Sequence, residues 1–389
     1  MTRAAALLAA GLVAAAPVSA QMTVETVEGW TFTFAGNVNA FYVFEREARS
    51  GQVSLPGAAV GVGRQGSSVR SGYLPAFAVL SARRTEGGTT VGVHFGFAPQ
   101  IHTSSSGDTA SAGARIDMRQ VYLTASGAWG QILAGREIGL FARQNLLNDM
   151  SLFGAGATGG NFGNPAATTL GRSGFGYIYP GFHSQLTYTS PAGQALQLSV
   201  GVFDPLPNNG FDELVLPRIE SEVTYSRGAT LAWIAALVQH GTDTAIDRGA
   251  TAWGLSGGVR IRAGGFGLTS GGYSGLGIGT TRLFADARGS DPLLADLRRS
   301  HGWLAQLTWT RPGQPLTLGA SYGASRLESG DSEPRFELTN QSATAGAYVQ
   351  LTPSLKLVGE ATRAWSSDDV DGTRANQSLA GALGLMLFF

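Results

Sequence analysis

Residues 30–45, WTFTFAGNVNAFYVFE, alternate between two kinds of side chain. Every second position from Trp30 to Phe44 carries an aromatic, aliphatic or small residue, whereas most of the intervening positions carry Thr or Asn. A β-strand sends successive side chains to opposite faces, so this period of two predicts a long strand with one apolar and one polar face. The aromatic residues near both ends of the apolar face are typical of a strand that faces lipid.

The same alternation recurs along the rest of the chain. It is clearest at 91–97, 182–188, 196–202, 253–262 and 303–309. Seven short connections have the Gly, Pro and Ser content of tight turns, at 83–88, 127–130, 190–194, 226–229, 263–265, 311–315 and 352–354. Eight longer connections alternate with them. These fifteen connections predict an all-β chain of about sixteen antiparallel strands, with the short turns and long loops of a transmembrane barrel.

The composition favours a membrane barrel over a set of soluble domains. Only 14% of the 389 residues are charged, whereas soluble domains usually carry about 25%. Cysteine is absent, which excludes a disulfide framework and a thiolate metal site. The formal net charge is zero and gives no indication of nucleic-acid binding. Lys356 is the only lysine, so the other 26 of the 27 Lys and Arg residues are arginine.

The first twenty residues have the three parts of an export signal. Arg3 is the positive start, residues 4–16 form an apolar stretch, and Val18-Ser19-Ala20 is a small-residue cleavage site. The apolar stretch is shorter than the ~20 residues that a spanning helix needs. We therefore expect residues 1–20 to be a cleaved signal peptide and residues 21–389 to be an outer-membrane barrel in contact with lipid.

Three stretches resemble the general porins of Gram-negative bacteria, most of all those of α-proteobacteria. Residues 35–42, AGNVNAFY, are similar to the first porin strand. Residues 119–123, RQVYL, with 133–136, LAGR, resemble the strand–turn–strand before the porin constriction loop. The C-terminal stretch ALGLMLFF places Gly384, Leu387 and Phe389 at the positions of the outer-membrane insertion signal.

This resemblance implies a homotrimer of sixteen-stranded barrels, inserted by the outer-membrane assembly machinery through the C-terminal strand. It also implies passive diffusion of small hydrophilic solutes and ions, and a long third loop, here about 137–176, that folds into the lumen. In many porins acidic residues of that loop face basic residues of the wall, and Arg119 matches one of these. The acids of this loop are only Glu137 and Asp149, beside Arg143 and Arg172, which departs from the family pattern.

The charges of the pore wall are the residues expected to carry function, because a channel selects solutes by its width and by its lining charges. The residues expected at the constriction or in the lumen are Arg115, Asp117, Arg119, Arg136, Arg143, Asp149, Arg172, Arg260 and Arg262. Alternation places Arg260 and Arg262 on one inward face, and 115, 117 and 119 on another. Clustered arginines in a narrow channel favour small anions or polar neutral solutes. The alternative for each arginine is a solvated rim charge without effect on selectivity.

The sequence carries no recognisable catalytic, metal or cofactor motif, so we expect neither an enzyme nor a bound cofactor. His94 and His183 fall on inward positions, but a metal site needs more ligands than the sequence places beside them. Two other functions remain as alternatives on the same barrel, an outer-membrane enzyme and an adhesin. A secreted β-solenoid is a third alternative, although no repeat of roughly 20–50 residues is present.

Overall fold

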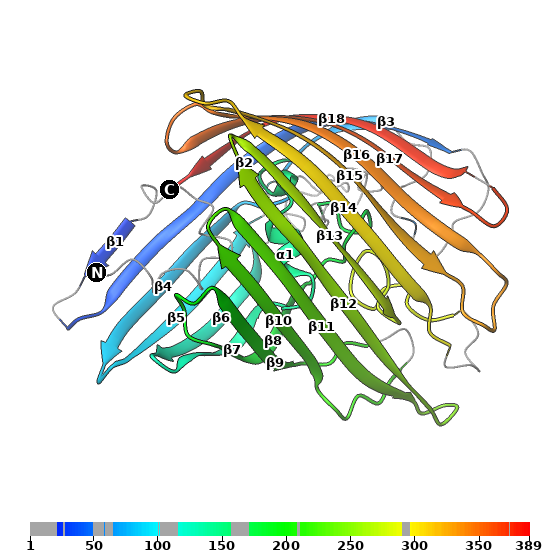
Figure 1. The fold of residues 1–389 in the computed structure, drawn as a ribbon, viewed down its shortest axis with the longest axis horizontal. Coiled ribbons are helices and arrows are strands. Elements are labelled where there is room, and N and C mark those ends of the chain that lie inside the picture. Colours follow the sequence, from blue (N-terminus) through cyan, green and yellow to red (C-terminus); the bar gives the residue numbers. More distant parts are fainter. Residues whose placement is uncertain are drawn as a thin grey trace, which may run out of the picture.

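The computed structural model describes residues 22–25, 28–49, 58, 65–99, 101, 116–156, 171–207, 211–289, 296–372 and 374–389. The expected signal peptide, residues 1–20, lies outside these residues. The chain folds into one sheet that curves into a barrel (Figure 1). Its strands are β1 (Met22–Glu25), β2 (Thr31–Arg49), β3 (Gln65–Arg70), β4 (Phe77–Glu86), β5 (Thr89–Pro99), β6 (Ile116–Gly127), β7 (Gly130–Ile138), β8 (Phe182–Thr189), β9 (Leu196–Phe203), β10 (Arg218–Arg227), β11 (Thr230–Asp243), β12 (Arg248–Ala263), β13 (Phe266–Leu276), β14 (Arg299–Thr310), β15 (Leu316–Glu328), β16 (Glu337–Gln350), β17 (Leu355–Asp368) and β18 (Arg374–Phe388).

Two short helical turns interrupt this all-β chain. The α-helix α1 (Arg143–Leu147) and the 3-10 helix η2 (Met150–Phe153) both lie in the connection between β7 and β8. None of the helices in the described part of the chain has the length and apolar character needed to cross a membrane.

Sixteen strands close the barrel, which confirms the number predicted from the connections. From β4 to β18 each strand pairs antiparallel with the next, and β18 then pairs with β2 down to Phe388, which lies opposite Asn37. Both β3 and β4 pair with β2, opposite residues 41–46 and 31–37 respectively. They are therefore two halves of one interrupted wall strand, and the short β1 is an addition beside the start of β2.

The outer face of the barrel is apolar and the inner face is mainly polar. On β2 the side chains of Val38 and Tyr42 are 53% and 54% exposed, whereas Asn37 and Asn39 between them are 0% and 1% exposed. The exposed apolar residues lie on the face that a membrane barrel turns toward lipid. The alternation read from residues 30–45 therefore gives the orientation of this strand correctly.

The seven predicted short turns all lie between consecutive strands, from β4–β5 to β16–β17. Two of the eight connections expected to be long are also short, namely residues 244–247 between β11 and β12 and residues 369–373 between β17 and β18. These connections are short because their flanking strands run for 14 to 16 residues, whereas ~9–11 residues suffice to cross the membrane.

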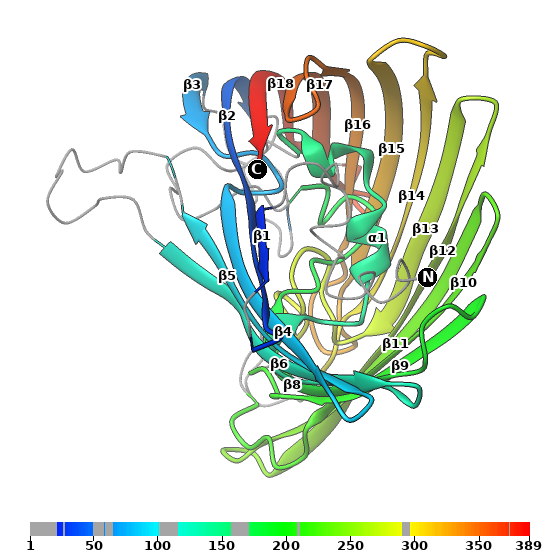
Figure 2. The same cartoon turned by 90° about the vertical axis from the view of Figure 1, so that its left-hand side faces the viewer.

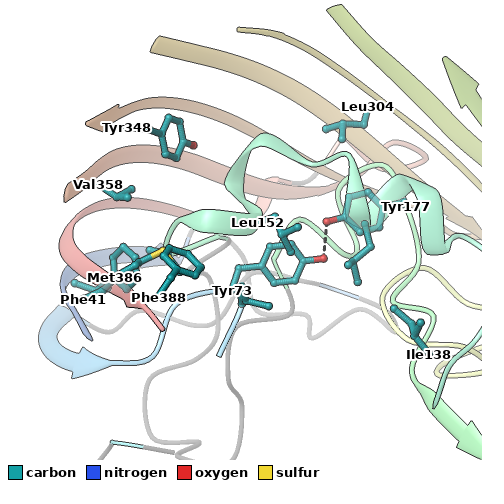
Figure 3. Close-up of a cluster of buried hydrophobic side chains, with 14 residues drawn as sticks. Phe41, Tyr73, Ile138, Leu152, Tyr177, Leu304, Tyr348, Val358, Met386 and Phe388 are labelled. Atoms are coloured by element: carbon teal, nitrogen blue, oxygen red, sulfur yellow. Dashed lines mark hydrogen bonds between the residues drawn. The ribbon is translucent and has the colours of Figure 1, made fainter. Parts of the chain in front are cut away.

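A cluster of buried apolar side chains lies on the inner side of the wall (Figure 3). It joins Phe41 of β2 and Phe388 of β18 to Leu152 and Tyr177 of the β7–β8 connection. The interior of a wide barrel is otherwise polar, because it faces water. The cluster therefore marks the place where a segment of the chain packs against the inner wall.

Candidate constriction site

The connection between β7 and β8 contacts the inner wall along much of its course. Its described residues are 139–156 and 171–181, which are called the inner loop below. Figure 2 shows α1 within the ring of strands. The hydrogen bonds of the inner loop go to side chains of β10, β12, β14, β15 and β17. This set of contacts is the candidate constriction site.

Two glutamates of β10 hold the start of the inner loop. The N–H groups of Leu140 and Phe141 donate to Glu220 Oε2 at 2.7 and 2.9 Å, and the Arg143 guanidinium donates to Glu222 Oε1 at 2.6 Å. Burial alone lowers the pKa of Arg143, but the nearby carboxylates, Glu222 first, outweigh burial and raise this pKa above its usual value. Arg143 is therefore a permanent cation, and β10 fixes the entry of the loop.

Polar side chains of β12 and β14 hold the middle of the inner loop. Arg260 Nη1 donates to Asn148 Oδ1 at 2.5 Å, and the Met150 N–H donates to Gln306 Oε1 at 2.9 Å. Asn148 lies two residues before η2 and Met150 is the first residue of η2, whereas the start of α1 is held by β10. The stretch from α1 to η2 is thus tied to two separate parts of the wall.

Groups of β16 and β17 hold the later parts of the inner loop. Arg172 is fully buried, and its Nη2 donates to the Ser342 carbonyl at 2.8 Å. Burial lowers the pKa of Arg172. Glu360 Oε2 accepts the N–H groups of Ala155 and Gly156 at 2.8 and 3.1 Å. The inner loop is therefore fixed at both sides of its undescribed portion.

Asp149 is occupied within the inner loop. Its carboxylate accepts the Ser151 N–H at 2.9 Å, which caps η2, and the Tyr177 hydroxyl at 2.6 Å. Burial and then the Asp149 charge raise the pKa of Tyr177 well above its usual value, so the phenol keeps its proton. The Tyr73 hydroxyl lies 2.9 Å from that of Tyr177. Asp149 is only 4% exposed, so its role is to order the loop.

The wall segment between β3 and β4, residues 71–76, pairs with the inner loop. The Tyr73 N–H donates to the Gly154 carbonyl at 2.8 Å, and the Leu74 N–H donates to the Leu152 carbonyl at 3.1 Å. In an uninterrupted barrel these N–H groups would bond to a neighbouring strand. The inner loop therefore supplies backbone acceptors to the wall as well as receiving support from it.

Glycines on the inner faces of β12 to β15 make room for the inner loop. A side-chain carbon on Gly323 would lie 2.0 Å from the Phe175 carbonyl oxygen, and one on Gly319 would lie 2.7 Å from Met150 Sδ. Both distances are shorter than atoms in contact allow. Because the Phe175 oxygen belongs to the backbone, Gly323 accepts a side chain only if the loop moves, whereas the flexible Met150 side chain can shift away from Gly319. The abundance of glycine thus has a local use at this site.

Replacing Gly323 with valine is expected to displace the inner loop while the barrel still forms. Overpacking of this kind costs about 1–3 kcal/mol, which the barrel wall withstands and a loop contact does not. We expect the single-channel conductance of Gly323→Val in planar bilayers to differ from wild type by roughly twofold. Gly381→Val is the control, because Gly381 lies on the outer face with no atom within 4 Å. Equal conductance in both variants would show that the glycine does not position the loop.

Among the predicted residues, Arg260 and Arg262 both occupy inward positions of β12. They continue the row of Ser256, which is 3% exposed. Arg260 is half-buried and reaches the inner loop, whereas Arg262 is exposed. The structure thus brings Arg260 together with Arg143 and the rest of the inner loop on one side of the lumen.

Arg119 lies at a β-bulge. The register between β5 and β6 shifts between Gly96 and Phe97, and Arg119 is the extra residue of β6. Met118 beside it is 45% exposed on the outer face. The Arg119 guanidinium carbon lies 5.7 Å from the centre of the Phe182 ring. The bulge interrupts the alternation on which a shared face for positions 115, 117 and 119 depends.

Arg136 of β7 is predicted to lie in the lumen, but it occupies an outward-facing position of the strand. It pairs with Val121, two residues from the outward Leu123, and it is exposed. The structure therefore places Arg136 apart from the inner loop contacts. Arg115 and the side chain of Asp117 lie outside the described residues.

The carboxylates that hold the inner loop, Glu220, Glu222 and Glu360, are not among the residues predicted from the sequence. The alternation of β10 does place Glu220 and Glu222 on its inward face, opposite the outward Ile219. Their partners, however, lie far along the chain and include plain backbone N–H groups, which leave no sequence signal. At the start of the loop the wall supplies acids and the loop supplies the cation Arg143, the reverse of the arrangement that the resemblance implies.

The three residues of the expected insertion signal lie at the seam that closes the barrel. The Phe389 N–H donates to the Gly36 carbonyl at 3.0 Å, and the Gly36 N–H donates to the Phe389 carbonyl at 2.8 Å. Leu387 is 46% exposed on the outer face. A side-chain carbon on Gly384 would lie 2.4 Å from the Phe41 ring. These positions combine lipid contact with close packing at the seam.

The fold and the site together define a transmembrane β-barrel channel. The barrel is closed, apolar outside and polar inside, and a loop lies against its inner wall. In the part of the chain that the structure describes, no group of three or more His, Cys, Asp or Glu side chains could hold a metal ion. The chain belongs to the Gram-negative porin family, whose sequence profile matches residues 4–369.

Solved structures with a similar fold are outer-membrane proteins. The outer membrane channel DcaP of Acinetobacter baumannii has a TM-score of 0.70 at 15% identity, over 94% of this chain and 99% of that chain. An anion-selective porin from Comamonas acidovorans has a TM-score of 0.63 at 13% identity, over 92% and 100% of the two chains. OmpF of Salmonella typhi, in complex with daunomycin, has a TM-score of 0.62 at 12% identity, over 95% and 100%. A search among curated protein sequences gave no match.

Proposed function

We propose that this outer-membrane porin is a passive diffusion channel in which the inner loop narrows the lumen and inward arginines favour small anions and polar neutral solutes. The supporting observation is the charge balance around the inner loop. The fit of a solute then depends on the space that the loop leaves, and the rate of ion passage depends on the uncompensated charge beside it.

The charges nearest the start of the inner loop compensate one another. Glu222 is paired with Arg143 at 2.6 Å and Glu220 with Arg218 at 2.8 Å, and three of these four side chains are almost fully buried. Among the described residues, Arg260 and Arg262 have no carboxylate within ion-pair distance. The pairs cancel, and β12 keeps two positive charges in its inward row.

Two uncompensated arginines are enough to bias a narrow aqueous path. The barrel wall and the surrounding lipid have a low dielectric constant, so the field of lining charges is focused into the water of the pore. Anions gain in local concentration beside β12, and cations lose. In an open aqueous path that is coupled to no energy source, the solute moves only down its own gradient.

Reversal potentials test this proposal. In a salt gradient across a planar bilayer we expect wild-type channels to prefer chloride over potassium, and the double variant Arg260→Ser/Arg262→Ser to lower the chloride-to-potassium permeability ratio by roughly twofold or more. Arg363→Ser is the matched control, because Arg363 is exposed on β17 and stacks on Trp365 with its guanidinium carbon 5.4 Å from the ring centre. That control is expected to keep the wild-type ratio.

Two outcomes would contradict the proposal. A wild-type channel with strong cation preference would exclude a positive constriction. A double variant with the wild-type permeability ratio would show that the charges of β12 lie away from the ion path, as solvated charges would.

The proposal includes how the protein reaches the outer membrane and assembles there. The three-part signal supports removal of residues 1–20 after export. The seam contacts of the C-terminal strand support its use as the segment that the assembly machinery receives. A similar barrel, OmpT of Vibrio cholerae, is described in a trimer form, with a TM-score of 0.55 at 12% identity. We take this chain to form a homotrimer as well.

A further inference from the structure

Lys356, the only lysine of the chain, lies beside two aromatic rings on the inner wall, within cation–π distance of both. It belongs to the inward row of β17, which continues with the fully buried Val358. Its Nζ lies 4.4 Å from the centre of the Phe153 ring and 5.8 Å from the centre of the Phe388 ring. The two rings meet edge to face with their centres 5.9 Å apart. This is the geometry in which an ammonium ion is attracted to aromatic faces.

The two rings come from parts of the pore that must stay in register. Phe153 is the last residue of η2 in the inner loop, and Phe388 is the last residue of β18, which closes the barrel against β2. Phe388 is only 3% exposed, and its N–H donates to the Ser354 carbonyl at 2.8 Å, so it is rigidly placed. The ammonium ion therefore joins a loop residue to a fixed residue of the wall.

The ammonium ion has no competing partner among the described residues. Within them the ammonium group of Lys356 forms no ion pair, and the two aromatic rings are its observed contacts. A lysine in a wide aqueous lumen would otherwise extend its flexible stem into water. Here the side chain is half-buried against the rings.

A residue of opposite charge to Lys356, in the same inward row of β17, holds the next residues of the inner loop. Glu360 lies four residues after Lys356 and accepts the N–H groups of Ala155 and Gly156. The cation thus holds the ring at the end of η2, and the anion holds the backbone that follows it. Two charged residues of one strand thus hold three loop positions, Phe153, Ala155 and Gly156.

We propose that Lys356 is a positioning residue of the pore, which clamps the inner loop to the closing strand through the Phe153 and Phe388 rings. This inference rests on the proposed role of the inner loop as the constriction. Loss of the clamp leaves the barrel closed but lets the end of η2 move, so the open-channel current becomes less steady.

The single lysine makes the test selective. A water-soluble acetylating ester neutralises Lys356 and, elsewhere, only the N-terminal amine. Lys356→Arg keeps the cation but does not react, Lys356→Gln removes the cation, and Phe153→Leu removes the ring while the lumen charge stays. We expect Lys356→Gln, Phe153→Leu and acetylated wild type each to raise the variance of the open-channel current by roughly twofold or more over wild type, and Lys356→Arg, treated or not, to match wild type.

A second readout does not depend on current. The methyl group of Met150 lies in η2, and a chain with methyl-labelled methionine contains only five such groups. We expect the Met150 methyl resonance, assigned with Met150→Leu, to shift and sharpen in Lys356→Gln and Phe153→Leu but not in Lys356→Arg.

Three results would overturn the inference. If Phe153→Leu behaved as wild type while Lys356→Gln was noisy, the lysine would act through its lumen charge alone. If Lys356→Arg was as noisy as Lys356→Gln, a cation beside the rings would not be the relevant contact. If the Met150 methyl resonance was the same in every variant, the clamp would be refuted. This result does not depend on ion current, so it separates failure of the clamp from failure of the proposed channel function.

Discussion

Glu360→Gln is expected to raise the single-channel conductance of the pore by freeing the end of the inner loop. The Glu360 carboxylate accepts the Ala155 and Gly156 N–H groups at one oxygen and the Tyr348 hydroxyl at the other, at 2.7 Å. Hydrogen bonds to a charged group contribute about 1.5–3 kcal/mol each. The glutamine amide has one acceptor oxygen in place of two. Its NH2 group would face either the two loop N–H groups or the Tyr348 hydroxyl, which are themselves donors.

The expected result is a freed end of the inner loop and a wider mean opening. We expect the single-channel conductance of Glu360→Gln to rise by roughly twofold, with larger sugars admitted in liposome-swelling assays. Thr362→Val is the control, because Thr362 is the next inward residue of β17 and its hydroxyl bonds to Thr344 at 3.0 Å. An unchanged conductance and size limit in Glu360→Gln would show that this carboxylate does not hold the constriction.

Removal of Phe389 is expected to have the largest effect on assembly. The Phe389 backbone makes two hydrogen bonds to Gly36 at the seam, and its ring lies against Phe34 with the ring centres 5.2 Å apart. Backbone groups of a closed barrel have no water to replace a lost partner within the membrane. Deletion leaves the Gly36 N–H and carbonyl without partners, whereas Phe389→Ala keeps the backbone bonds and loses only the ring.

The two variants separate physical closure from recognition in the cell. We expect the deletion to lower the yield of heat-modifiable, folded barrel in cells by roughly tenfold, and also to slow refolding into detergent. We expect Phe389→Ala to refold normally in detergent but to accumulate poorly in the outer membrane. Phe44→Ala, which removes an outward aromatic of β2 that is 48% exposed, is the control. Wild-type yields of both C-terminal variants would contradict the role given to this residue.

The barrel wall could be predicted from the sequence because its code is local. Side chains alternate with a period of two, and Gly, Pro and Ser collect where the chain turns, so the strand number and the inward faces of β2 and β12 follow from neighbouring residues. The two short connections at 244–247 and 369–373 are the exceptions, since nothing local marks how far a strand continues beyond the membrane.

The inner loop contacts could not be predicted in the same way. The partners of Glu220 and Glu360 are backbone N–H groups that lie about 80 and 205 residues away in the chain, and every residue except proline has such a group. Arg143 and Arg172 were predicted to belong to the loop, but their pairing with β10 and β16 depends on three-dimensional placement. A side-chain pattern alone cannot supply that placement.

Local irregularities also limit what alternation predicts. One extra residue reverses the face of every residue beyond it, and the bulge at Arg119 has this effect on β6. The break between β3 and β4 is a second irregularity of the wall. Only the pairing of both halves with β2 reveals it.

The break between β3 and β4 has a consequence for redesign of this pore. The Tyr73 and Leu74 N–H groups bond to carbonyls of the inner loop, and Asn39 of β2 bonds to the Leu74 carbonyl at 3.0 Å in place of a neighbouring strand. Deleting the inner loop to widen the pore would remove the acceptors of these two N–H groups, which lie in the barrel wall. Pore width and wall stability are therefore coupled in this protein. A wider pore would require a shorter inner loop and also a continuous wall strand that gives the Tyr73 and Leu74 N–H groups new acceptors.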